Sequence, residues 1–184
     1  MKKRGFIVFF IILMLLFIGA FIGPLNCAAQ EDLIDPLSPF KPFIGKTWKG
    51  ILNDSSEPKP MIDVSHWERA LNGRAVRILH SINDGEYGGE TIILWDANKE
   101  ILIYYYFTTA GFFTNGTMTI EKTKFISHEF VTGNQKGITE VKSISEILPD
   151  GKLSVKAQYF QNGKWEDGHQ VIYAQNSKTK VIFK

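Results

Sequence analysis

The segment from Glu90 to Glu121 constrains the fold more than any other part of the chain. It contains three stretches rich in β-branched and aromatic residues, separated by residues that favour turns. The stretches are residues 90–95, 101–108 and 114–121, and the turn residues are Asp96 to Lys99 and Gly111. The segment therefore predicts three consecutive antiparallel β-strands.

The rest of the chain repeats this pattern of short apolar stretches and turns. Asn72-Gly73, Asp150-Gly151 and Asn162-Gly163 are dipeptides typical of β-hairpins. We expect about ten strands, at residues 47–52, 61–71, 74–82, 90–95, 101–108, 114–121, 125–132, 138–148, 153–161 and 169–175. No stretch keeps a helical period for more than a turn or two, and a meander of this length must hide its two edges. The sequence therefore predicts an all-β fold, an up-and-down antiparallel β-barrel.

The length of 184 residues, 44% of them hydrophobic, suits one domain with a real core. We expect a signal peptide at residues 1–29, an irregular, proline-bearing lead-in at 30–46 and the barrel at 47–184. The central strands are apolar on both faces. One face would fill the interior, and the other needs a cover, for which the lead-in from Leu33 to Phe43 or a partner subunit in an oligomer are both candidates.

The N-terminus has the three parts of a secretory signal. Lys2-Lys3-Arg4 is a positive start, residues 6–23 are apolar, and Cys27-Ala28-Ala29 offers small residues to a signal peptidase. We expect cleavage before Gln30 and a secreted or periplasmic protein. The alternative is an uncleaved membrane anchor at residues 6–23, because such a length reaches the lower limit of a spanning helix. Cys27 is the only cysteine, so the cleaved protein would have neither disulfides nor thiol chemistry.

Charge argues against nucleic acid as a partner. The chain has a formal net charge of +2, but three of its basic residues lie in the predicted signal. Residues 30–184 then carry 18 basic and 19 acidic groups. Phosphate binding needs a concentrated basic surface, which this near-neutral balance does not predict.

Several short motifs resemble those of a known superfamily. The run from Phe43 to Gly50, with Gly45 and Trp48, looks like the G-x-W opening of calycin barrels, which include lipocalins and fatty-acid-binding proteins. The motifs Leu71-Asn72-Gly73-Arg74, Gly88-Gly89 and Trp95-Asp96 are similar to an uncharacterised bacterial family of lipocalin-like domains. The resemblance spans about Phe40 to Tyr173 and implies a calycin-type barrel, but that family offers no functional residues to transfer.

This chain departs from the calycin pattern at one position. Calycins usually place an Arg or Lys near the end of the last strand, packed over the tryptophan. Here Gln175 and Asn176 stand near that place, and Lys178 is the nearest base.

The Asn72-Gly73 hairpin brings polar residues together. Its expected register places Glu68 opposite Arg77, with His66 on the same face. If this face is inside the barrel, the cluster could hold a ligand carboxylate. If it is outside, it is an ordinary cross-strand ion pair. The sequence leaves both open and favours the second.

No motif predicts a metal, a cofactor or a catalytic residue. The four histidines, His66, His80, His128 and His169, lie on four different predicted strands, without the spacing of a metal site. Haem bound through a single histidine is conceivable in a calycin-type barrel, with His169 as the candidate. There is no G-x-S-x-G or H-E-x-x-H motif.

The sequence thus favours an exported lipocalin-like domain that binds a small, mostly apolar molecule in its barrel. The residues expected to bind the ligand are Glu68, Arg77, Tyr105, Phe107, Met118 and Tyr159. One alternative is an enzyme that uses the same cavity on a lipid-like or cyclic substrate, with a histidine as acid or base. The other is a structural or interaction module with a filled barrel.

Overall fold

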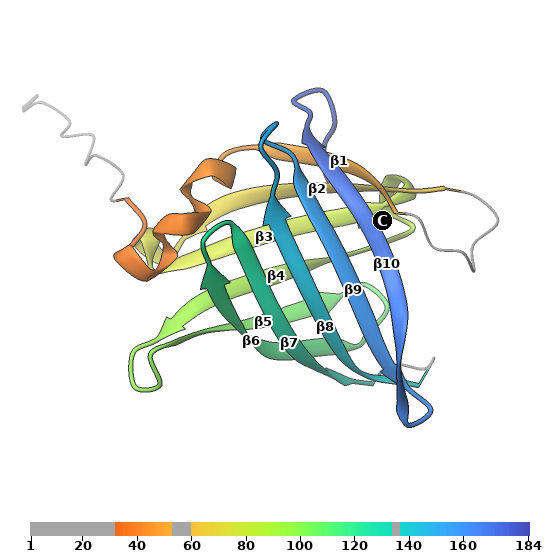
Figure 1. The fold of residues 1–184 in the computed structure, drawn as a ribbon. Helices are drawn as coiled ribbons and strands as arrows, with labels where there is room; N and C mark the ends of the chain where they lie inside the picture. Colours follow the sequence, from red (N-terminus) through yellow and green to blue (C-terminus); the bar gives the residue numbers. More distant parts are fainter. Residues whose placement is uncertain (1–31, 53–59, 134–136) are drawn as a thin grey trace, which may run out of the picture. The chain divides into compact units, whose positions relative to one another are not determined.

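Ten antiparallel strands follow one another around a closed ring, and the first strand pairs with the last (Figure 1). The computed structural model describes residues 32–52, 60–133 and 137–184. The strands are β1 (Thr47–Leu52), β2 (Met61–Ala70), β3 (Ala75–Ile82), β4 (Tyr87–Asp96), β5 (Ile101–Thr108), β6 (Phe113–Glu121), β7 (Lys124–Thr132), β8 (Ile138–Ile147), β9 (Leu153–Gln161) and β10 (Lys164–Gln175). The predicted all-β, up-and-down barrel is confirmed.

Two strands begin three or more residues earlier than the sequence predicts. β4 begins at Tyr87 rather than Glu90, because Gly88 and Gly89 pair with β3 instead of forming a loop. β10 begins at Lys164 rather than His169, and a register shift between Asp167 and Gln170 separates its two halves. A β-bulge of this kind bends a strand without ending its pairing. It also interrupts the alternation of inward and outward residues, so the alternation in the sequence does not reveal that the strand continues.

The connection between β2 and β3 is longer than a two-residue hairpin but keeps the predicted register. Leu71, Asn72 and Gly73 all have positive φ angles, of 47°, 52° and 84°, in the 3₁₀ turn η2 (Leu71–Gly73). Glu68 nevertheless lies opposite Arg77, as expected. A second such turn, η3 (Asn83–Gly85), connects β3 to β4.

The lead-in is a 3₁₀-helix, η1 (Asp35–Phe43), and not an irregular segment. It lies at one end of the barrel in Figure 1, drawn in orange. Its side chains Leu37, Phe40 and Phe43 are 0%, 1% and 2% exposed and belong to the same buried cluster as Val76 and Ile93 from the barrel wall. The lead-in therefore plugs the interior instead of covering the outer face.

Strand pairing shows which residues face the interior. Trp67 pairs with Ile78, Ile78 with Thr91, and Thr91 with Tyr106, and directly paired residues share a face. Trp67 and Ile78 pack against the buried cluster, so this is the inner face. The outer face carries the alternate residues, such as Arg77 and Tyr105.

Parts of the N-terminal prediction lie outside the described residues. These are the signal peptide at residues 1–29, with its cleavage site, and the alternative anchor at 6–23. Within residues 32–52, 60–133 and 137–184, no helix is both long and apolar enough to cross a membrane.

Candidate functional site

The barrel interior has two halves with different side chains. The half next to η1 is packed with apolar residues, including Trp48, Leu102, Phe125 and Leu153. The other half, called here the polar half, consists of inner-face residues with polar groups: Asp63, His80, Tyr87, Tyr106, Thr114, Glu129, Tyr159, His169 and Tyr173. Polar side chains are uncommon inside a barrel unless they are hydrogen-bonded, so their partners decide what this half can do.

Five of these residues form one continuous hydrogen-bonded chain from five strands. His80 Nδ1 lies 3.1 Å from Asp63 Oδ1, and His80 Nε2 lies 2.6 Å from the Tyr106 hydroxyl. The Tyr106 hydroxyl lies 2.7 Å from that of Tyr87, and the Tyr173 hydroxyl donates to Asp63 Oδ2. This set, Tyr87–Tyr106–His80–Asp63–Tyr173, is called the tyrosine–histidine chain below.

The Asp63 carboxylate, which can only accept hydrogen bonds, decides where the protons of the tyrosine–histidine chain lie. A carboxylate can only accept, so His80 Nδ1–H donates to Asp63. In a neutral imidazole Nε2 then accepts from the Tyr106 hydroxyl. Burial raises the pKa of Tyr106, Tyr87 and Tyr173 above the usual value for tyrosine, so all three stay protonated. The arrangement is a carboxylate that orients a histidine, which in turn holds a phenol.

Glu129 is a second carboxyl group on the inner face. It accepts a 2.5 Å hydrogen bond from the Thr114 hydroxyl and also interacts with the Tyr104 hydroxyl. Burial raises its pKa above the usual value for glutamate, more than these hydrogen bonds lower it. Thr114 is the strand partner of Tyr106, so Glu129 lies next to the tyrosine–histidine chain.

Glycines on neighbouring strands make room for the tyrosine rings. A Cβ at Gly89 would come within 2.5 Å of the Tyr106 ring, and one at Gly50 within 2.9 Å of the Tyr173 ring. A Cβ at Gly168 would come within 2.8 Å of the Tyr159 ring. Each of these rings lies over a strand position without a side chain, which sets the shape of the polar half.

The structure places the six sequence-predicted ligand residues on two different faces. Met118 and Tyr159 are on the inner face, and Met118 packs against the apolar cluster. Glu68, Arg77, Tyr105 and Phe107 are on the outer face. The expectation that Tyr105 and Phe107 line the interior is wrong, since their neighbours Tyr104 and Tyr106 hold the inner positions. Successive residues of β5 point to opposite faces, and aromatic residues occupy both sets of positions. The sequence of β5 therefore did not indicate which set faces the interior.

Arg77 takes part in an ion-pair network on the outer surface. Its Nε and Nη2 donate to the two carboxylate oxygens of Glu90, at 2.8 and 2.9 Å, and its Nη1 donates to Glu68 at 3.3 Å. The bond to Glu90 raises the pKa of the guanidinium. The surface interpretation of the hairpin is the one that the geometry supports, and the sequence missed Glu90, which β4 brings alongside β3.

The four histidines lie in separate environments. His66 is near Thr47 on the outer face, with 2.9 Å between its Nδ1 and the Thr47 hydroxyl, and His128 pairs with Glu140 at 2.7 Å. His80 belongs to the tyrosine–histidine chain, and His169 Nδ1 is bonded to the Tyr159 hydroxyl. Among the described residues, no three His, Cys, Asp or Glu side chains come close enough together to hold a metal ion.

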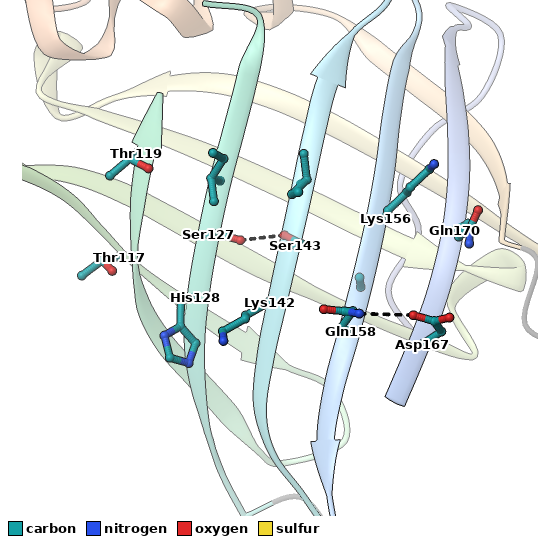
Figure 2. Close-up of a pocket in the computed structure, with 13 residues that line it drawn as sticks. Thr117, Thr119, Ser127, His128, Lys142, Ser143, Lys156, Gln158, Asp167 and Gln170 are labelled. Carbon is teal, nitrogen blue, oxygen red and sulfur yellow. Dashed lines mark hydrogen bonds between the residues drawn. The ribbon is translucent and has the colours of Figure 1, made fainter. Parts of the chain in front are cut away.

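One hollow lies on the outer face. It has a volume of 510 Å³ and extends over β6 to β10, with His128, Lys142, Lys156, Gln158, Asp167 and Gln170 among its lining residues (Figure 2). Its polar groups bond mainly to each other or to neighbours: Gln158 donates to Asp167 at 3.2 Å, and Lys142 Nζ lies 4.3 Å from the Trp165 ring. We regard this hollow as a curved stretch of surface, because it brings together none of the buried titratable groups.

A second hollow, of 450 Å³, lies at the end that η1 plugs, beside Phe43, Trp48 and Gln175. Gln175 is the direct strand partner of Trp48, so the base that calycins place over the tryptophan is absent from that position. The Trp48 indole N–H is buried and has no hydrogen-bond partner among the described residues. The fold therefore closes this end with η1.

Comparison with known proteins identifies the fold but no family. No protein-family model matches the sequence, and no curated protein is significantly similar to it. Among solved structures, the chain resembles the crystal structure of Rv2717c from M. tuberculosis, with a TM-score of 0.59 and 13% sequence identity. The match covers 79% of this chain and 99% of that one. At this identity the likeness shows a shared fold alone.

Proposed function

We propose that this protein is an exported, lipocalin-like domain that binds a small, mostly apolar molecule in the polar half of its barrel. The observation that carries the proposal is the contrast between the two halves of the interior. At the η1 end the inner side chains Val76, Trp48 and Leu102 are 0%, 4% and 4% exposed, whereas the His80 side chain keeps 19% of its surface exposed. An interior filled on one side and accessible on the other is what a binding barrel requires.

The chemistry of the polar half supports binding of a molecule with an apolar body and a few polar groups. Tyr87, Tyr106 and Tyr159 offer aromatic faces together with hydroxyl groups. Pockets for small molecules are usually lined in this way, with few, fixed polar groups among aromatic walls. Export follows from the N-terminal signal predicted from the sequence and stays part of the proposal.

Native mass spectrometry of the purified protein tests the proposal directly. We expect a co-purifying molecule, or a mass added on incubation with a lipid and metabolite extract. The variant Tyr106→Leu, which removes the central ring, should lose most of the added mass. Arg77→Ala, whose guanidinium lies on the outer face, should keep it. Equal retention of the added mass by Tyr106→Leu and the wild type would place the ligand elsewhere, and the absence of any added mass would favour the filled-barrel interaction module.

A second function, acid–base catalysis in the same cavity, is favoured by one specific observation. The Asp63 carboxylate and the Tyr106 hydroxyl fix both ring nitrogens of His80, which is the arrangement that a histidine acid or base needs. Incubation of the protein with lipid-like and cyclic compounds, followed by product analysis, tests it. Products that form with the wild type and disappear with His80→Gln would support an enzyme, and unchanged compounds would support a binder.

A further inference from the structure

On the inner face of the described strands, lysine and arginine occur only at the two ends of the barrel. Among the lysines and arginines on the described strands, only Arg69 and Lys164 share the inner-face parity. Arg69 is the strand partner of Val76, in the packed half beside η1, and Lys164 is at the exposed rim. The ionisable groups of the polar half, besides its tyrosines, are instead Asp63, which is buried, and Glu129, His80 and His169, which are half-buried.

The carboxyl groups of Asp63 and Glu129 differ in how many hydrogen-bond and ion-pair partners they already have. Asp63 uses one oxygen for His80 and the other for Tyr173. Glu129 has only the hydroxyls of Thr114 and Tyr104, and no ion pair within the described part of the chain includes it. A carboxylate has about four acceptor positions, and a buried one is costly without a counter-charge. Glu129 therefore keeps acceptor capacity, and the positive group that acts on it electrostatically, His128, is itself paired with Glu140 on the outer face.

Aromatic rings stand beside this carboxyl group. Tyr104 interacts with Glu129 directly, and Glu129 also acts electrostatically on Tyr87 and Tyr106. The face of a tyrosine ring attracts a cation, more strongly where water is excluded. A carboxyl group beside tyrosine side chains is thus suited to a cation on an apolar body and unsuited to an anion.

We infer that the ligand of the barrel carries a protonated amine, which Glu129 receives as its counter-ion between the rings of Tyr104 and Tyr106. This inference rests on the proposed function and narrows its ligand class. A ligand with an amine is the opposite of the ligand with a carboxylate that the sequence would have favoured if Arg77 faced the interior. A ligand carboxylate would instead bring a second negative charge next to Glu129.

The raised pKa of Glu129 gives the inference a pH signature. Tyr104 from β5 and Thr114 from β6 face the carboxyl group, and His128, the preceding residue on β7, acts on it electrostatically. Val141 is its apolar strand partner on β8, and the other titratable side chains of the same interior are Asp63, His80, Tyr87, Tyr106, Tyr159, His169 and Tyr173. Because burial favours the protonated form, an amine has to displace a proton from Glu129 when it binds at low pH. Its affinity should therefore rise with pH through the pKa of Glu129.

Isothermal titration with two matched ligand series tests the inference. One series is tryptamine, 3-ethylindole and indole-3-propionate, and the other is octylamine, octanol and octanoate. Within at least one series we expect the amine to bind about tenfold or more tightly than the neutral compound, and the carboxylate to bind most weakly. Amine affinity should rise between about pH 5 and about pH 8.

The variant Glu129→Gln keeps the hydrogen-bonding shape but removes the charge. It should bind amine and neutral compound equally and lose the pH dependence. Glu140→Gln, which removes a carboxylate paired with His128 on the outer face, is the matched control and should behave like the wild type. Neutral compounds or carboxylates that bind as tightly as amines would overturn the inference while leaving the proposed function intact. No binding by either series would count against both.

Discussion

Glu129 shows how a single half-buried carboxyl group couples the barrel to pH. In the folded protein its pKa is raised by burial, whereas in the unfolded chain it has its ordinary value. The folded state therefore binds the proton more tightly than the unfolded state. The contribution to stability is complete below the unfolded pKa and is lost as pH rises through the folded pKa.

This sign gives a prediction for the variant Glu129→Gln. As pH rises from about 4 to about 8, the free energy of unfolding of the wild type should fall relative to that of the variant, since only the wild type loses the bound proton. Urea denaturation of both proteins at a series of pH values measures the difference. A difference that stays constant, or that grows in favour of the wild type, would show that Glu129 is not penalised by burial.

The sequence could not reveal Glu129 or the tyrosine–histidine chain, for a physical reason. Asp63 and Tyr173 lie 110 positions apart and meet only because β1 stands between β2 and β10. The predicted up-and-down barrel implies that the first strand pairs with the last, but a single sequence does not fix the register across that seam, and the register decides which side chains meet there. The pair Gly88-Gly89 is evident in the sequence. That the Tyr106 ring lies over Gly89, however, depends on the register between β4 and β5, which the sequence does not give.

The element that differs most from the sequence-based expectation is η1, although its sequence follows a three-residue pattern. The segment Asp35–Phe43 reads D-P-L-S-P-F-K-P-F, with a proline and then an apolar residue in every group of three. A 3₁₀-helix has three residues per turn, so Leu37, Phe40 and Phe43 fall in one row. The prolines argued against a helix because an α-helix does not tolerate such spacing. In contrast, the strands were predictable because alternation and turn residues act locally.

The plug makes a stability prediction at the level of this element. Phe40 is 1% exposed and stacks on Phe125, with 5.1 Å between the ring centroids. Phe40→Ala should lower the free energy of unfolding by about 3–5 kcal/mol, because it removes a buried ring and leaves a cavity. The control is Phe130→Ala, on the outer face with 53% of the residue exposed, which should cost less than about 1 kcal/mol. Thermal or urea unfolding measures both, and similar costs would mean that η1 does not hold the end closed.

For the whole molecule, the ring is most weakly paired where its two ends meet. The seam between β1 and β10 has three paired positions, from Trp48↔Gln175 to Gly50↔Tyr173, whereas β6 and β7 pair at nine. Local opening is easiest where the fewest hydrogen bonds must break. The barrel should therefore open at this seam before it opens elsewhere.

Amide hydrogen exchange tests this expectation. Amides of β1 and β10 that bond across the seam should exchange about tenfold or more faster than those between β6 and β7. The amides of β1 that pair with β2, at six positions, provide a control within the same strand and should be the slower set in β1. Uniform protection around the ring would rule out a preferred opening.

The glycines beneath Tyr106, Tyr159 and Tyr173 constrain the order in which residues of this interior can be substituted during evolution. A side chain added at Gly168 collides with the ring of Tyr159, while a smaller residue at 159 merely leaves a gap. The order of substitutions is therefore not free: the ring has to disappear first, and only then can the glycine be replaced. A descendant of this protein with a different ligand should show the small residue facing a surviving glycine far more often than the reverse combination.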